Sequence, residues 1–176
     1  MACTLTKGRL EPCKTVAGIK KVFFIDYTAG LEDSATFDAD DQITNFDSAL
    51  TLYEYVIVGN ADTFDETGTT SRDNGTTFYD TSGTVVLRAQ TLADRKELQI
   101  MGAARPQVVT LGYDGIYKIY GLENGCDVAV TASSGAGMGD LNGYTLTITA
   151  QEPSLANFIS AAIIDDTTNT TVTSGV

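Results

Sequence analysis

The spacing of hydrophobic residues predicts a chain built mainly of β-strands. Short runs rich in β-branched and aromatic residues, such as 22–27 and 52–58, are typical of buried strands. In 144–149, apolar residues alternate with threonines, which is the pattern of a strand with one face in a core and the other in water. Further strands are predicted at 76–79, 84–89, 108–113, 116–123 and 126–132, the last three as an antiparallel meander with Asp-Gly and Asn-Gly turns.

Only the stretch 91–105 has the pattern of an α-helix. Thr91 is placed to cap it, because a side-chain oxygen there can accept a hydrogen bond from the amide three residues further on. Pro106 should end it, since proline disfavours helical geometry in the residue before it and has no amide hydrogen. The apolar face of this helix, with Leu98 at its edge, is expected to comprise Ala93, Ile100, Met101 and Ala104.

These elements predict an antiparallel β-sandwich or barrel with one flanking α-helix. At 176 residues the chain is long enough for one domain with arms. Residues 1–19 read as an N-terminal arm that is either frayed or ordered on a neighbouring subunit. Residues 20–153 are expected to form the β domain, and 154–176 a last strand or a second arm.

The stretch 59–77 is long, polar and dotted with glycines, and such loops usually have a function. One interpretation is a contact loop that docks on another subunit, and the other is a hairpin whose tip is residues 73–75. An apolar group in the C-terminal segment is a further surface of interest. The candidate inter-subunit contacts are therefore Asp62, Phe64, Arg72, Asn74 and Phe158.

The composition argues against an enzyme and against a resident cofactor or metal. The sequence has no histidine, which removes Ser-His-Asp and Cys-His catalysis and histidine metal ligation. Three cysteines without a CxxC pair do not make a zinc site. Cys3 and Cys13 could approach each other across a turn, or all three thiols are free in a reducing cytoplasm. A glycoside hydrolase would need carboxylate pairs such as Asp62 and Asp65, or Asp38 and Asp40, in a cleft that the sequence does not indicate.

The charge points to partners other than DNA or membranes. The formal net charge is −12, from 23 acidic and 11 basic residues, and phosphate binding needs clustered cations. An acidic wall could instead line a passage for DNA and keep it from adhering, or the acidity serves solubility alone. No stretch approaches the roughly 20 apolar residues of a membrane span, and no signal-peptide pattern is present, so we expect a protein made in the cytoplasm.

Three stretches resemble proteins of tailed-phage virions, and tail tube proteins most of all: ACTLTKGRLEPCK at 2–14, SRDNGTTFYD at 71–80, and MGDLNGYTLTITAQE at 138–152. The resemblance implies a small β-sandwich or barrel with a flanking helix. It also implies that six copies form a ring whose inner strands join into a barrel. Rings then stack into a conduit with a negative lumen, and a long loop and terminal arms contact the next ring.

The function implied is that of a non-enzymatic tail tube subunit, located in the virion tail and assembled in the host bacterial cytoplasm. Its partners would be further copies of itself and other tail or neck proteins, with DNA only as passing cargo and no membrane. A head decoration or head–tail connector protein is the alternative, because small acidic β-rich proteins serve there too.

Overall fold

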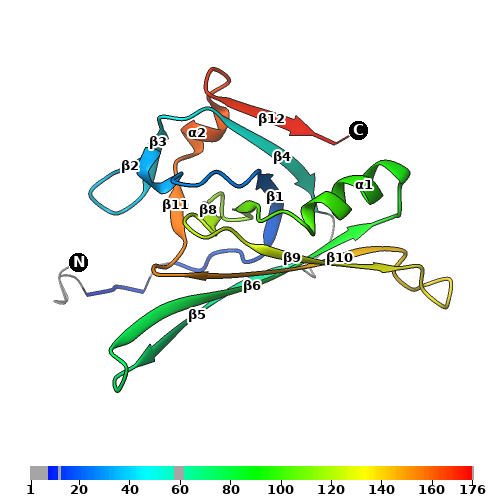
Figure 1. Ribbon diagram of the computed structural model, residues 1–176, viewed down its shortest axis with the longest axis horizontal. Helices are drawn as coiled ribbons and strands as arrows, with labels where there is room; N and C mark the ends of the chain where they lie inside the picture. Colours follow the sequence, from blue (N-terminus) through cyan, green and yellow to red (C-terminus); the bar gives the residue numbers. More distant parts are fainter. Residues whose placement is uncertain (1–7, 12, 58–61, 176) are drawn as a thin grey trace.

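The computed structural model describes residues 8–11, 13–57 and 62–175, and it is mainly β, with two sheets and one main helix (Figure 1). The eight-stranded sheet contains, in spatial order, β12 (Thr170–Ser174), β4 (Leu50–Val56), β1 (Ile19–Ile25), β7 (Gln107–Gly112), β8 (Tyr117–Tyr120), β11 (Asn157–Ile159), β3 (Ile43–Phe46) and β2 (Ala35–Phe37). The four-stranded sheet contains β5 (Thr63–Ser71), β6 (Thr76–Arg88), β10 (Gly143–Glu152) and β9 (Asp127–Ser133). The helices are α1 (Leu92–Met101) and α2 (Ala161–Asp165), with a 3-10 turn at Glu32–Ser34.

Strand β1 is buried on both faces, which explains its unbroken apolar sequence. It pairs antiparallel with β4 on one side and β7 on the other. Val22 and Phe24 point into a core between the two sheets, whereas Phe23 and Ile25 point into a second core on the other face. The curled eight-stranded sheet and α2 enclose this second core. The sandwich therefore has two hydrophobic cores that share β1 as a wall.

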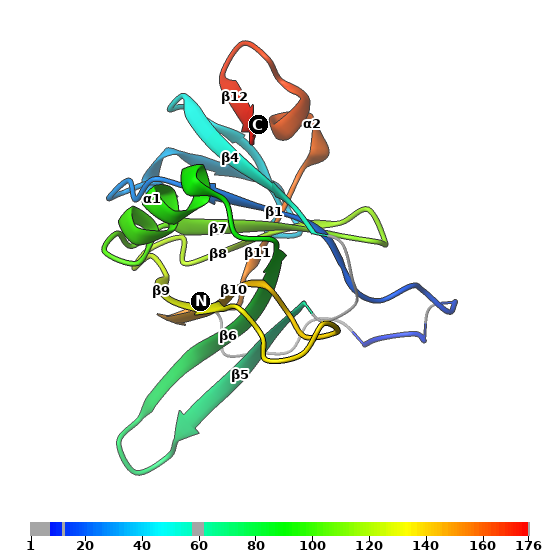
Figure 2. The ribbon, with the colours of Figure 1, turned by 90° about the vertical axis from the view of Figure 1, so that its right-hand side faces the viewer.

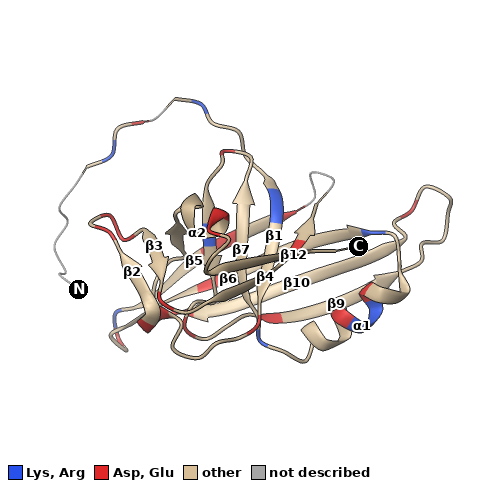
Figure 3. Ribbon diagram, turned by 90° about the horizontal axis from the view of Figure 1, so that it is seen from above, with Lys and Arg blue, Asp and Glu red and all other residues tan. Residues whose placement is uncertain are grey.

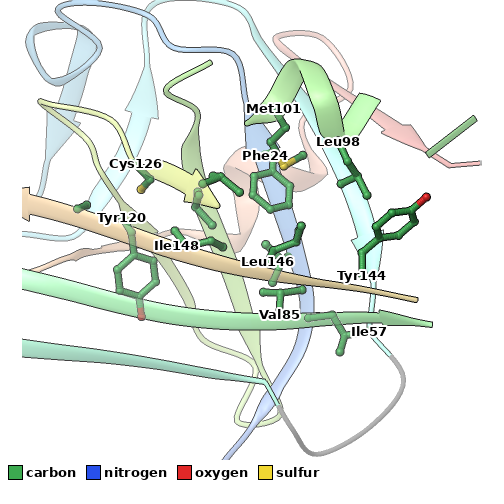
Figure 4. Packing of buried hydrophobic residues seen from close by; sticks show 14 residues of the cluster. Phe24, Ile57, Val85, Leu98, Met101, Tyr120, Cys126, Tyr144, Leu146 and Ile148 are labelled. Atoms are coloured by element: carbon green, nitrogen blue, oxygen red, sulfur yellow. The ribbon is translucent and has the colours of Figure 1, made fainter. Parts of the chain in front are cut away.

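The first core lies between the four-stranded sheet, β1 and α1. Figure 4 shows Leu146 and Ile148 of β10 pointing toward Phe24, with Leu98 and Met101 of α1 above them. Leu146 and Ile148 are fully buried, and the threonines between them face outward, as the alternation in 144–149 predicted. The predicted sandwich with a flanking helix is thus confirmed.

Helix α1 is shorter than predicted and turned about its axis. The amide of Asp94 donates to the Thr91 side-chain oxygen over 3.1 Å, so the predicted cap is present. The helix ends at Met101 and not at Arg105: the Gly102 amide still bonds to Leu98 four residues back, but the Ala103 amide bonds to Ile100 only three residues back, in a tighter turn. Leu98 and Met101 are buried, whereas Ile100 is 53% exposed and Ala93 is exposed too, so the predicted apolar face was wrong at these two residues.

Two other predictions are corrected by the sheets. The two strands predicted within 76–89 are the single strand β6, which is 13 residues long. The predicted three-stranded meander is a β7–β8 pair only, because β9 leaves the eight-stranded sheet and pairs with β10. This crossing uses Gly121 and Gly125, which both have positive φ and turn the chain between the sheets.

The N-terminal and C-terminal segments differ in how they relate to the two sheets. The C-terminal segment is part of the eight-stranded sheet: β11 lies between β8 and β3, and β12 pairs in parallel with β4. Residues 8–11 and 13–18 form no helix or strand, all are exposed, and they extend beyond the sheets (Figure 2). The chain joins the body at Gly18, whose carbonyl accepts from the amide of Tyr113 over 3.0 Å.

Candidate functional site

The segment predicted as a long loop is mostly a projecting β-hairpin. Strands β5 and β6 pair over nine residues, from Thr63↔Thr84 to Ser71↔Thr76, and the pair extends well beyond the rest of the four-stranded sheet (Figures 1 and 2). The prediction of an irregular loop over 59–77 was therefore wrong from residue 63 onward, and residues 59–61 lie outside the described part. Because the alternation of threonine with charged residues carries no apolar side, the local pattern did not reveal a strand.

Arg72 and Asn74 lie at the exposed tip of this hairpin. The amide of Asn74 donates to the Ser71 hydroxyl over 3.3 Å, and Gly75 takes a positive φ of 64°. This matches the alternative interpretation of 73–75 as a hairpin tip. The side chains of Arg72 and Asn74 are free to meet another molecule.

Asp62 and Phe64 lie at the base of the hairpin and point inward. Asp62 is 8% exposed, and its carboxylate accepts from the amide of Val86 over 2.7 Å. Burial raises the pKa of this carboxyl, although the Val86 hydrogen bond lowers it in part. The ring of Phe64 packs on Tyr120, with ring centroids 4.9 Å apart. Both side chains therefore make contacts within this chain and hold the base of the hairpin against the rest of the domain.

The five predicted contact residues do not form one patch. The nine residues of β5 separate Asp62 from Arg72, which puts the two about 33 Å apart along the extended chain. Phe158 belongs to the other sheet, on β11, where it is 44% exposed and has the Lys118 ammonium 5.2 Å from its ring centroid. Tip, base and β11 are three separate places on the molecule.

Sequence reasoning missed how the outer face of the four-stranded sheet is composed. The strand register places Thr63, Thr84 and Thr147 in one row across β5, β6 and β10. Asp65, Ser82 and Thr149 form the next row, and Thr67, Asp80 and Gln151 the one after it. Across the four strands the only cation is Arg88, at the end of β6. This face is therefore acidic and rich in hydroxyl side chains, and we call it the acidic hydroxyl face.

In each possible catalytic pair, one carboxylate serves local backbone structure: Asp62 accepts from the amide of Val86, and Asp38 acts in the β2–β3 turn. Asp38 accepts from the amides of Asp40 and Gln42, each over 2.9 Å, and so closes the β2–β3 turn. The glycine-rich loop after β9 is closed in the same way, because Asp140 accepts from the amides of Ala136 and Gly137. These amides are therefore not available to cradle a phosphate.

A groove of about 560 Å³ runs between residues 16–19, the start of β5 and the β7–β8 turn. Its carboxylates include Asp62, already bonded to Val86, and Asp114, which accepts from the amide of Ile116 over 3.1 Å. Within the described residues, no group of three or more His, Cys, Asp or Glu is arranged to hold a metal ion. Cys13 is exposed and unpaired, Cys126 is buried with a thiol pKa raised to about 12, and Cys3 lies outside the described residues.

No family model, curated protein or solved structure matches this chain. Among the described residues, no helix has the length and apolar character needed to cross a membrane. The geometry thus directs attention to the surfaces available for assembly: the hairpin, the acidic hydroxyl face, and the open strand edges.

Proposed function

We propose that this chain is a structural subunit of a phage tail tube, in which rings of six copies stack around a channel for DNA. The observation that carries the proposal is the four-stranded sheet. Its outer face presents threonine, serine and aspartate side chains, and Arg88 is the only cation on its strands. A wall of this kind repels the phosphate backbone and offers it a single cation, too few for stable binding.

The edges of this sheet suit closure into a ring. Strands β5 and β9 are its two outer strands, and neither has a second partner among the described residues. Pairing β5 of one copy with β9 of the next would satisfy both edges and make a continuous barrel. Six such sheets, with strands about 4.8 Å apart, give a backbone circle about 37 Å across before strand tilt widens it, which accommodates a DNA duplex.

Two of the three stretches that resemble tail tube proteins lie in the parts this assembly would use. Residues 71–80 include the hairpin tip and the start of β6, and residues 138–152 include the whole of β10. The hairpin projects beyond the sheet, where it can contact the ring above or below (Figure 2). Fold, charge and motif positions therefore support the same proposal.

Electron microscopy of negatively stained, purified protein over a range of concentrations tests it. Rings or stacked tubes with a central hole are the expected result. A strictly monomeric species under every assembly condition would refute the tube. Binding only to preformed capsids would identify a decoration or connector protein instead.

A thiol-protection experiment tests which face lines the channel. In a Cys3→Ser, Cys13→Ser background, Thr147→Cys puts a thiol on the outer face of the four-stranded sheet, and Thr171→Cys puts one on the exposed strand β12 as a matched control. A maleimide on a polymer too large for the channel should label both in monomers. In tubes it should label only the control, and equal labelling of both would contradict the assigned lumen.

A further inference from the structure

The dipeptide Asn-Gly occurs three times in the sequence, and the fold places the three copies in different surroundings. Glycine has no side chain, so its amide nitrogen is poorly shielded from the side chain of the asparagine before it. That nitrogen can attack the asparagine Cγ and close a five-membered ring, provided that both groups are free to move. The three pairs are Asn74-Gly75 at the tip of the β5–β6 hairpin, Asn124-Gly125 between β8 and β9, and Asn142-Gly143 at the start of β10.

The Asn74-Gly75 pair is open. Both residues are exposed, and they lie beyond the last strand pair of the hairpin, Ser71↔Thr76. The Asn74 backbone amide donates to the Ser71 hydroxyl, but within the described residues neither the Asn74 side chain nor the Gly75 amide makes a hydrogen bond. A Cβ built on Gly75 meets nothing within 4 Å. The pair can therefore reach the reactive geometry without breaking the strand ladder.

The Asn124-Gly125 pair is held by hydrogen bonds on both reacting groups. The Gly125 amide donates to the Gly121 carbonyl over 3.0 Å, and the Asn124 side-chain amide donates to the Gln151 carbonyl over 2.9 Å. A Cβ added to Gly125 would lie 2.6 Å from the Arg105 carbonyl oxygen, so the glycine is also enclosed. Ring closure here requires these contacts to break first.

The Asn142-Gly143 pair is enclosed by two strands. Gly143 is buried and pairs with Arg88 of β6 on one side and Ser133 of β9 on the other. The Asn142 carbonyl accepts from the amide of Ala89 over 2.7 Å. The end of the sheet must therefore open before this pair can react. Opening has a free-energy cost, and each 1.4 kcal/mol of it slows a reaction that depends on opening about tenfold.

We propose that Asn74 is a self-modification site of the unassembled chain, at which the Gly75 amide nitrogen converts the Asn74 side chain into a carboxylate. The nitrogen loses its proton and forms a bond to Cγ, the Cγ–Nδ2 bond breaks, and ammonia leaves. Water then opens the ring at either carbonyl, which gives aspartate or isoaspartate. The conversion consumes one water and releases one ammonia, and it needs no oxidant, metal or cofactor.

The product changes the charge of the hairpin tip. Figure 3 shows a basic and an acidic residue at this tip, and these are Arg72 and Asp73, whose charges cancel. A carboxylate at position 74 leaves the tip with a net charge of about −1 at neutral pH. The isoaspartate form also routes the main chain through the former side chain, which lengthens the turn. The inference concerns the free chain, so it does not rest on the proposed function.

Peptide mapping by mass spectrometry tests the order of reactivity. The purified chain, below its assembly concentration, is incubated at neutral and mildly alkaline pH, both folded and unfolded in urea. Water containing heavy oxygen marks conversion that occurs during the incubation. In the folded chain Asn74 should convert at least about 10-fold faster than Asn124 and Asn142. In urea the three rates should agree within about 3-fold, because glycine follows each asparagine.

Three outcomes of this mapping bear on the inference. A rate that rises with pH supports it, because the attacking nitrogen must lose its proton. Conversion of Asn74 no faster than that of Asn124 or Asn142 in the folded chain would overturn it. A preference for Asn74 that persists unchanged in urea would overturn it too, since the fold would then not be the source of the difference.

A pair of conservative variants tests the site directly. Asn74→Gln removes the reaction, because glutamine would have to close a less favourable six-membered ring. Asn142→Gln is the matched control at another exposed asparagine that precedes glycine. On ion exchange, aged wild type and the control should accumulate a more acidic form that isoaspartyl methyltransferase labels, and Asn74→Gln should not. Equal accumulation of this form in Asn74→Gln would refute the assignment, whether or not the protein forms tubes.

Discussion

Replacing Gly83 by alanine tests whether Phe64 has an internal role. Gly83 sits in the middle of β6, and a Cβ added there would lie 2.6 Å from Cε1, 2.8 Å from Cδ1 and 2.9 Å from Cζ of the Phe64 ring. The ring cannot simply withdraw, because it packs on Tyr120 at a centroid distance of 4.9 Å. Gly83→Ala should therefore force either the ring or the strand out of place.

The cost can be estimated from opposing effects. Overpacking of this kind costs about 1–3 kcal/mol, and removing a glycine from the unfolded chain returns about 0.4–1 kcal/mol. The net loss of unfolding free energy should be about 1–2 kcal/mol, or a fall in Tm of about 2–8 °C for a chain of this length. Urea denaturation followed by circular dichroism, at protein concentrations below assembly, measures it. Gly139→Ala, where a Cβ meets nothing within 4 Å, is the control and should be close to neutral.

The partner variant makes the reasoning refutable. In a Phe64→Ala background the ring is gone, so Gly83→Ala should become neutral or stabilising by up to about 1 kcal/mol. An equal cost of Gly83→Ala with and without the Phe64 ring would show that the ring is not the reason for the glycine.

Three further predictions concern the helix and a buried carboxyl. Leu98→Ala should lower the free energy of unfolding by about 2–4 kcal/mol, because the Leu98 side chain is buried. Ile100→Ala should lower it by less than about 0.5 kcal/mol, because Ile100 is 53% exposed. Urea titration measures both. Thr91→Ala should cost about 1 kcal/mol by calorimetry, since the Asp94 amide loses its acceptor; no change would disprove the cap. Burial raises the pKa of Glu152 above its usual 4.5, so this residue's contribution to stability falls as pH rises through the raised value. The free energy of unfolding of Glu152→Gln should therefore rise relative to that of wild type as the pH rises from 4.5. Urea denaturation at several pH values measures this, and a difference in midpoints that stays constant with pH would contradict it.

Local pattern predicted which residues form strands far better than which strands pair. The alternation in 144–149 and the Thr91 cap depend on neighbours a few residues away, and both are present in the structure. The split predicted in β6 failed because Ser82-Gly83 resembles a turn. The glycine is there to receive a ring from β5, 19 residues earlier. A requirement set by another strand leaves no trace in the local pattern.

The candidate site shows the same limit. A polar segment with a single aromatic residue suggested an exposed contact, but the hairpin turns that residue toward Tyr120. Its tip and the outer face of β5 remain exposed. The acidic hydroxyl face became visible only through the register that aligns Thr63, Thr84 and Thr147.

The strand order of the eight-stranded sheet has a consequence for how the chain folds. Its neighbours come from distant parts of the sequence: β1 pairs with β7, and β12 pairs with β4, with Thr170 opposite Leu50. High contact order slows folding, because long loops must close before any of these contacts form. During synthesis the β5–β6 hairpin is complete early, but the second core has no final wall until residues 157–174 emerge. A chain truncated before residue 157 is therefore left with open edges at β3 and β4.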